Sequence, residues 1–195
     1  MSVEQKNAEH GTHALFQNRW SPRAFDASKE VSEMDLNSCL EAARWAPSCF
    51  GEEPWRFIVC QRSTDEERWQ KLLGCLAPKN QEWAQNAPVL LMVCTSKTFS
   101  HNGSKNRWAE YDAGQASVSL CLQATALGLV THQMGGFDVD AVCDQFAIPE
   151  GCVPLAAIAM GFQGEANTLD DAFQASEAAS RVRKALTDII HHGDK

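Results

Sequence analysis

The sequence is short of positive charge. It has 17 lysines and arginines against 25 aspartates and glutamates, which gives a formal net charge of −8 at pH 7. Proteins that bind nucleic acid or anionic membranes need clustered lysine and arginine, and no long basic block is present. We therefore expect neither nucleic acid nor membrane among the partners.

Long apolar runs are also missing. None approaches the roughly 20 residues that a helix needs to span a bilayer. The stretch from Met1 to His13 is polar and mixed in charge, with no apolar signal-peptide core. We therefore expect a cytoplasmic protein, and its 195 residues predict a single domain, residues 1–195, with a sizeable core.

The sequence has no Cys-x-x-Cys motif, although it contains eight cysteines. These cysteines are scattered along the chain, at positions 39, 49, 60, 75, 94, 121, 143 and 152. Most lie inside apolar stretches such as residues 57–60 and 91–94, a pattern typical of reduced core thiols. His191 and His192 are adjacent in a polar tail, where solvated side chains are expected, so no metal site is predicted.

Apolar periodicity predicts the helices. One is expected over about residues 4–17, and a second follows the capping box Ser32-Glu33-Met34-Asp35. Residues 64–67 resemble another helix start, and Asp138 can cap a short helix that Pro149 ends. The longest helix, about 108–127, is apolar on most sides, which favours burial in the core, in a subunit interface, or in both.

Four short apolar runs predict strands, at residues 55–60, 89–95, 129–132 and 155–160. Continuous apolar runs imply a sheet that is covered on both faces. The expected class is α/β or α+β, with three layers and helices flanking a four- or five-stranded sheet. Residues 96–106 are polar and predict a loop, and from Gln163 onward the chain is polar and rich in alanine.

The run Arg19-Trp20-Ser21-Pro22-Arg23 places two guanidinium groups and a hydroxyl within five residues. Arginine presents a planar fork that suits phosphate or a polarised carbonyl, and proline lowers the entropy of holding the donors in place. In an acidic chain this cluster favours an anionic small molecule. An exposed basic turn before a helix is the alternative.

Three further segments can carry chemistry. Residues 46–55 form a polar turn bounded by prolines between a helix and a strand. Residues 133–136 place two glycines at a strand end, where backbone N–H groups can approach a ligand closely. Residues 181–184 form a second basic cluster in the tail. Each segment alone is weak evidence, because glycine pairs usually mark turns and basic clusters are usually solvated.

Taken in this order, the segments resemble the FMN-dependent nitroreductase family from Arg19 to about Ile190. The resemblance implies an α+β fold of three layers (α/β/α), with a central mixed sheet flanked by helices, in an intertwined homodimer. It implies FMN in the subunit interface and NAD(P)H as the electron donor. Hydride would pass through flavin N5 to a small-molecule acceptor, a nitroaromatic, quinone or enone, by ping-pong turnover; the choice of NADH or NADPH stays open.

The resemblance also implies which residues bind the cofactor. The phosphate, ribityl chain and pyrimidine edge of FMN would be contacted by Arg19, Ser21 and Arg23. Trp20 would add main-chain contacts. The phosphate would also be bound by Arg181 and Arg183. The partner subunit would line the flavin ring with the turn of Pro47, Ser48, Cys49 and Gly51. Along the opposite edge would lie Gln133, Met134, Gly135 and Gly136, with a glycine N–H directed at N5.

The turn departs from the family pattern, which usually has Asn where this chain has Gly51 and Gln where it has Glu53. No dedicated catalytic acid or base is evident. Cys49 is expected to be a small wall residue rather than a nucleophile, Glu52 and Glu53 to be solvated, and His132 to be a satisfied core or turn histidine. Two other functions stay open: a flavin-binding sensor or carrier without turnover, and a non-flavin protein that associates through its long helix.

Overall fold

The centre of the protein is a sheet of four antiparallel strands in the order β1-β2-β4-β3. The computed structural model describes residues 11–191 and 193. The strands are β1 (Trp55–Gln61), β2 (Val89–Ser96), β3 (Val130–Met134) and β4 (Cys152–Gly161). The four predicted strands are confirmed, with ends that shift by at most three residues.

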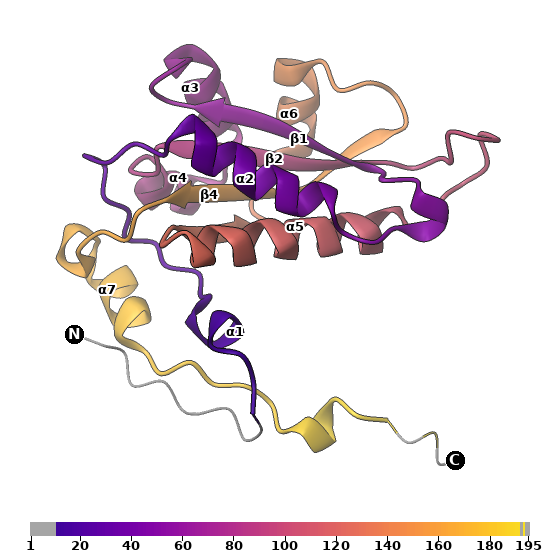
Figure 1. Cartoon of the computed structure of the whole chain (residues 1–195). Coiled ribbons are helices and arrows are strands. Elements are labelled where there is room, and N and C mark those ends of the chain that lie inside the picture. The colour runs from indigo at the N-terminus through magenta and orange to yellow at the C-terminus, as the bar shows by residue number, and fades with distance from the viewer. Residues whose placement is uncertain (1–10, 192, 194–195) are drawn as a thin grey trace.

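Helices cover both faces of the sheet (Figure 1). On one face lie α2 (Glu33–Arg44) and α5 (Ala109–Ala126), and on the other lie α3 (Glu66–Cys75), α4 (Pro78–Ala84) and α6 (Val139–Phe146). The central strand β2 alternates between these layers, because successive side chains of a strand point to opposite faces. Val89, Leu91 and Val93 pack toward α2 and α5. Leu90, Met92 and Cys94 pack toward the other three helices, which confirms the three layers.

Side-chain caps start several helices where the sequence predicts them. The Ser32 hydroxyl accepts a hydrogen bond from the Asp35 amide at 3.0 Å and begins α2. The Asp138 carboxylate caps α6 in the same way, accepting from the Ala141 amide at 3.0 Å. Each cap pairs an N–H group that the first turn of a helix leaves without a partner.

The sheet differs from the predicted mixed sheet, because every strand pair in the described residues is antiparallel. Apolar runs show where strands lie, but they do not show strand direction. Of the helix predicted over residues 4–17, residues 4–10 lie outside the described part, as does His192. In the described part, the helix α1 spans Ala14–Asn18. A helix near the C-terminus, α7 (Asp171–Ala178), is an addition to the prediction.

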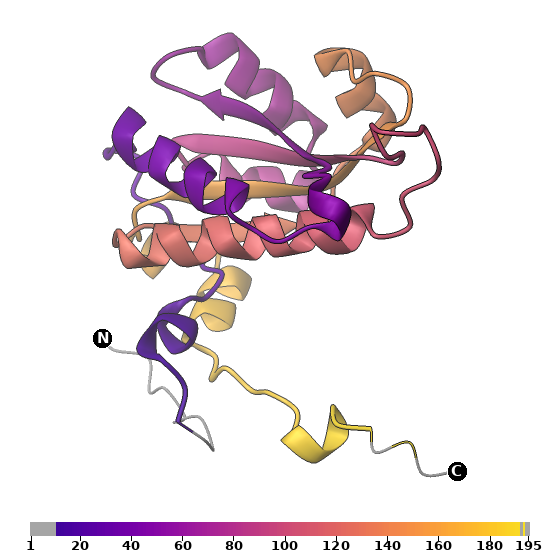
Figure 2. The same ribbon diagram turned by 45° about the vertical axis from the view of Figure 1, so that its right-hand side comes forward.

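The two ends of the described chain leave the body on the same side (Figure 2). Residues 11–18 and 179–191 extend away from the sheet, and the latter include a short 3-10 turn, η3 (Leu186–Asp188). Two further 3-10 turns are η1 (Cys49–Gly51) and η2 (Ala166–Thr168). We call residues 179–191 the C-terminal arm.

The cysteines are all free, and five of the eight are buried, as expected of reduced core thiols. Burial raises the pKa of the Cys39 and Cys94 thiols to about 12, so both stay protonated at neutral pH. Among the described helices, none has the length and apolar character needed to cross a bilayer.

Candidate functional site

A pocket of about 240 Å³ lies between residues 19–23 and residues 176–183. One wall is the segment 19–23, and the other is the end of α7 with the start of the C-terminal arm. The lining residues are Arg19, Trp20, Ser21, Arg23, Ser176, Glu177, Ala179, Ser180, Arg181 and Arg183. The structure therefore brings together the two basic clusters that the sequence places more than 150 residues apart. We call this the arginine pocket.

Hydrogen bonds tie the two walls together. The Arg181 guanidinium donates from Nη1 to the Gln17 carbonyl at 2.5 Å and from Nη2 to the Arg19 carbonyl at 2.9 Å. The Arg23 amide donates to the Glu177 carboxylate at 2.8 Å. A planar, multidentate donor such as Arg181 fixes both partners at once, so the arm and the segment form one unit.

The pocket is electropositive. In the part of the chain that the structure describes, no ion pair involves any of the four arginines that line it. Burial and the nearby charges of Arg19 and Arg183 lower the pKa of Arg181. Converging guanidinium groups that repel one another favour an anion with several negative oxygens, such as a phosphate.

Glu177 is the one carboxylate that lines the arginine pocket. It is only 5% exposed, and burial raises its pKa although the Arg23 amide and charge act in the opposite direction. Its oxygen accepts the backbone N–H of Arg23, so it holds the segment in place. The structure therefore assigns Glu177 a positioning role, and sequence analysis missed it.

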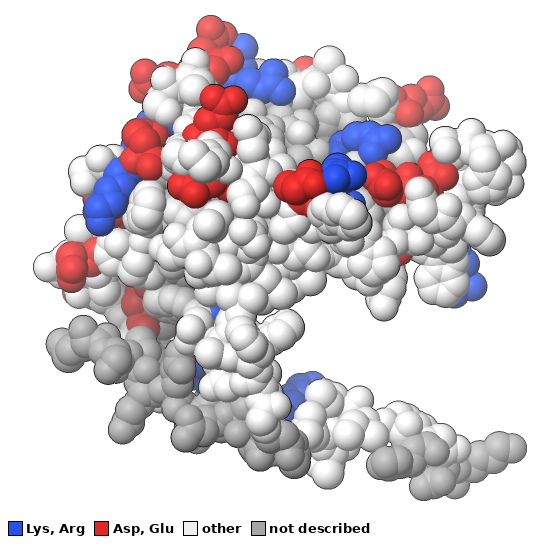
Figure 3. All heavy atoms as spheres, in the orientation of Figure 1, with Lys and Arg blue, Asp and Glu red and all other residues white. Residues whose placement is uncertain are grey.

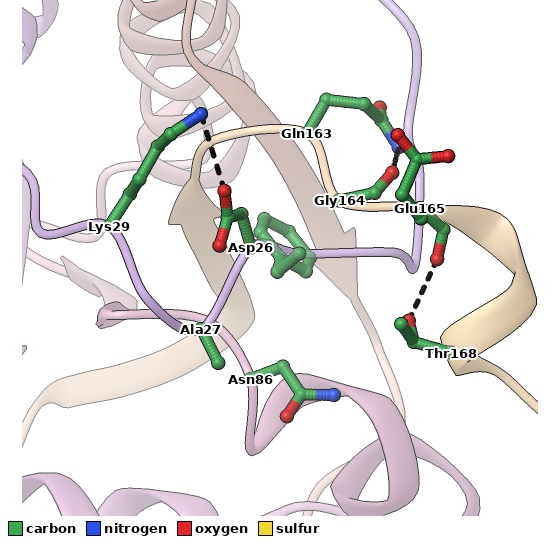
Figure 4. Close-up of a pocket in the computed structure, with 9 residues that line it drawn as sticks. Asp26, Ala27, Lys29, Asn86, Gln163, Gly164, Glu165 and Thr168 are labelled. Carbon is green, nitrogen blue, oxygen red and sulfur yellow. Dashed lines mark hydrogen bonds and ion pairs between the residues drawn. The ribbon is translucent and has the colours of Figure 1, made fainter.

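A second hollow, of about 350 Å³, lies beside the first and is shown in Figure 4. Its charges are already paired, since Lys29 lies 3.2 Å from Asp26, and Glu165 adds a second carboxylate. Hydrogen bonds from Ser28 and Lys29 lower the pKa of Asp26, so its carboxylate is ionised at neutral pH. An anion is therefore favoured in the arginine pocket and disfavoured in this hollow.

The middle of β3 contacts the segment 19–23 through His132. The His132 ring is half-buried, and its Nδ1 lies 2.9 Å from the Pro22 carbonyl, so the neutral ring carries its proton on Nδ1. Burial lowers the pKa of His132, which keeps the ring neutral at pH 7. Gln133 points to the opposite face, where its amide contacts the Cys121 sulfur at 3.4 Å. His132 is thus a satisfied histidine, as predicted.

The three residues that follow Gln133 lie in different surroundings. The Met134 side chain is buried in the core beside α3 and α4, so only its backbone can face a ligand. The Gly136 carbonyl accepts hydrogen bonds from the Ala77 amide at 2.9 Å and from Asn80 at 3.0 Å. Around Gly135, by contrast, no atom lies within 4 Å of the place where a Cβ would stand. Of the two glycines, Gly135 therefore leaves room for a ligand.

The turn of residues 47–53 lies away from the arginine pocket. Its Cys49 amide donates to Asp112 in the first turn of α5 at 3.0 Å, and its Ser48 hydroxyl accepts from the Glu53 amide at 3.0 Å. In Figure 1 the short turn after α2 and the helix α7 stand at opposite ends of α5. One copy of the chain therefore does not place Pro47, Ser48, Cys49 or Gly51 beside the arginines.

Some residues near these sites differ from the prediction. The wall formed by Ser176, Glu177, Ala179 and Ser180 was missed, because the tail is polar and rich in alanine. The signal that marks this helix is Asp170, which caps α7 by accepting from the Phe173 amide at 2.8 Å. Glu52 was expected to be solvated, but its side chain is only 9% exposed and binds Ser100 through two hydrogen bonds.

Comparison with known proteins gives a consistent match. The sequence profile of the Nitroreductase family matches residues 16–162. A protein of Haemophilus influenzae named as an NAD(P)H nitroreductase is 43% identical over 213 aligned positions, covering 90% of this chain and 93% of that one. A solved structure described as an oxidoreductase containing FMN is 36% identical, with a TM-score of 0.90, and the match covers 100% of this chain and 98% of that chain.

Proposed function

Because the chain belongs to the Nitroreductase family, we propose that it is an FMN-dependent oxidoreductase that uses NAD(P)H as its electron donor. Its acceptors are small molecules of the nitroaromatic, quinone or enone class, reduced by ping-pong turnover. The similar proteins named above, an NAD(P)H nitroreductase and an FMN-containing oxidoreductase, support this proposal.

The arginine pocket is the proposed phosphate site. The charges of Arg19 and Arg183 lower the pKa of Arg181, and none of the three arginines has an ion-pair partner in the described residues, so their donors fit a phosphate dianion. The Ser21 hydroxyl adds a short donor beside Arg19, which donates to it at 3.3 Å. This convergence of guanidinium groups that form no ion pair in the described residues is the observation that carries the proposal.

Arg23 and Gln133 would hold the flavin ring beside this site. We assign Arg23 to the pyrimidine edge of the ring, where a cation stabilises the negative charge of the reduced form. Gly135, which has open space around it, is assigned to a close backbone approach. When bound, FMN supplies the redox chemistry by accepting hydride and releasing it to the acceptor, and the protein contributes orientation and charge.

The ring also needs Pro47, Ser48, Cys49 and Gly51, and we propose that the partner subunit of a homodimer provides them. Figure 3 shows a surface hollowed between the body and the C-terminal arm. Exposed apolar side chains on the arm and on α5 suit burial against a second chain, and they are Val182, Leu186, Ile189, Ile190, Tyr111 and Val118. A dimer of this kind brings one subunit's turn to the other subunit's arginine pocket.

A spectroscopic experiment tests the proposed activity. The purified chain, loaded with FMN, is expected to lose its yellow colour on anaerobic addition of NADH or NADPH. Menadione or a nitroarene is then expected to restore the colour. A chain that binds FMN but is not bleached by either donor supports the alternative of a sensor or carrier. A chain that binds no FMN contradicts the proposal.

A further inference from the structure

Phe50 has an unusual backbone. It lies in the turn between α2 and β1 with a φ of 57°, next to Gly51 at 66° and close to Glu53 at 49°. A bulky residue rarely takes this left-handed conformation, and such strain persists where the surroundings enforce it, often at functional sites. The Phe50 side chain is also 86% exposed, more than any other large apolar side chain in the described residues.

Two further rings stand beside Phe50. The Phe50 and Phe99 ring centres are 5.8 Å apart with their planes 73° apart, and His101 lies 6.2 Å from Phe50. Phe99 and His101 also contact each other, at 5.3 Å. Because Phe50 keeps most of its surface exposed, a flat molecule can still stack on it. We call these three residues the aromatic cluster.

Glu52 binds the loop that carries Phe99 and His101. Its nearly buried carboxylate accepts hydrogen bonds from the Ser100 amide at 2.8 Å and the Ser100 hydroxyl at 3.1 Å. The loop that carries Phe99 is closed on itself, since the Phe99 amide donates to the Ser104 carbonyl at 2.9 Å. Figures 1 and 2 both show this loop beside the turn after α2. The rings are therefore held on two tethered segments.

The cluster directly follows the residues that the proposed function places against the flavin ring, Pro47 to Cys49. We propose that Phe50 is a specificity-determining residue on which the ring of a flat aromatic acceptor stacks while it lies on the flavin. This inference rests on the proposed function. Face-to-face or edge contacts between rings select flat, conjugated acceptors over acceptors without a ring.

An acceptor fits this cluster better than a second protein chain does. Phe50 is the one highly exposed apolar ring of the cluster, because Phe99 is 9% exposed, and the neighbours Ser100, His101 and Glu52 are polar or charged. A stable subunit interface buries a far larger apolar area than one ring. The C-terminal arm provides such apolar side chains elsewhere in the chain.

The test compares four variants of the FMN-loaded protein. Phe50→Asn and Phe50→Gly remove the ring and suit a left-handed backbone, so both are expected to fold. Phe50→Trp keeps a ring, and Trp45→Ala removes a different exposed ring from the end of α2. The readouts are the calorimetric affinity of the oxidised protein for menadione, the reduction rates with menadione and with ferricyanide, and the oligomeric state.

We expect the dissociation constant for menadione to rise about 2- to 12-fold in Phe50→Asn and Phe50→Gly, the range that one aromatic contact supports. Phe50→Trp and Trp45→Ala are expected to bind menadione as the unaltered protein does, and ferricyanide reduction is expected to stay the same. Equal affinity in Phe50→Asn and Trp45→Ala overturns the inference while the proposed function stands. A changed oligomeric state in Phe50→Asn assigns the ring to the subunit interface and also overturns it. If the unaltered chain binds no flavin, the result contradicts both this inference and the proposed function.

Discussion

Replacement of Arg19 by alanine tests the phosphate site most sharply. The Arg19 guanidinium has one intramolecular side-chain hydrogen bond, a long one of 3.3 Å to Ser21, and no ion pair in the described residues. Its donors are therefore available to a ligand. A hydrogen bond to a charged group contributes about 1.5–3 kcal/mol net. Since 1.4 kcal/mol is tenfold in affinity, Arg19→Ala is expected to weaken FMN binding about 10- to 150-fold.

The assay is a titration of the apoprotein with FMN and with riboflavin, followed by flavin fluorescence. Riboflavin lacks the phosphate, so its affinity is expected to change by less than about threefold, because the lost charge-assisted bond is absent there. Arg44→Ala removes an arginine from α2, which pairs with Glu41, and serves as the control with unchanged FMN affinity. Equal losses for FMN and riboflavin, or no loss for either, refute the assignment of Arg19 to the phosphate.

Three further predictions concern the segments that hold the site. Gly164→Ala places a Cβ 2.6 Å from the Phe25 backbone carbonyl, so we expect a loss of about 1–3 kcal/mol in the free energy of unfolding by urea; a loss below 0.5 kcal/mol, roughly that of a neutral surface change, contradicts this. Gly135→Ala meets no atom within 4 Å, so the apoprotein is expected to keep its stability while FMN binding weakens; unchanged FMN affinity argues against a close approach there. Burial raises the pKa of Glu177 above its usual 4.5, so the folded chain binds a proton on this carboxyl more tightly than the unfolded chain does. The free energy of unfolding therefore falls as the pH rises from 4.5 through the raised pKa. Glu177→Gln is therefore expected to gain stability relative to the unaltered protein between pH 4 and pH 7, measured by urea unfolding at several pH values, and a pH-independent difference between the two proteins disagrees with this reasoning.

The elements with a strong local signal could be predicted from the sequence. The capping side chains of Ser32, Asp65 and Asp138 begin helices where the residue pattern places them. The four apolar runs form the four strands of the sheet. These features depend on residues close together in the chain, so a pattern over ten or twenty positions contains the necessary information.

Features that depend on distant parts of the chain were harder to predict. The sequence contains both basic clusters, and the resemblance implied that they meet, but their hydrogen bonds through Gln17 and Glu177 appear only in the structure. Strand direction is a similar case, because an apolar run reads the same in either direction. Glu52 resembles a solvated turn residue until the loop of residues 97–105 is seen to fold over it.

A crystal structure of the chain grown with FMN shows whether the arginine pocket binds the phosphate. We expect a homodimer in which the FMN phosphate lies within hydrogen-bond distance of Arg19, Arg181 and Arg183. We also expect the flavin ring to lie against residues 47–49 of the second copy. Guanidinium groups that point into solvent, with the flavin bound elsewhere or absent from the crystal, rule this arrangement out.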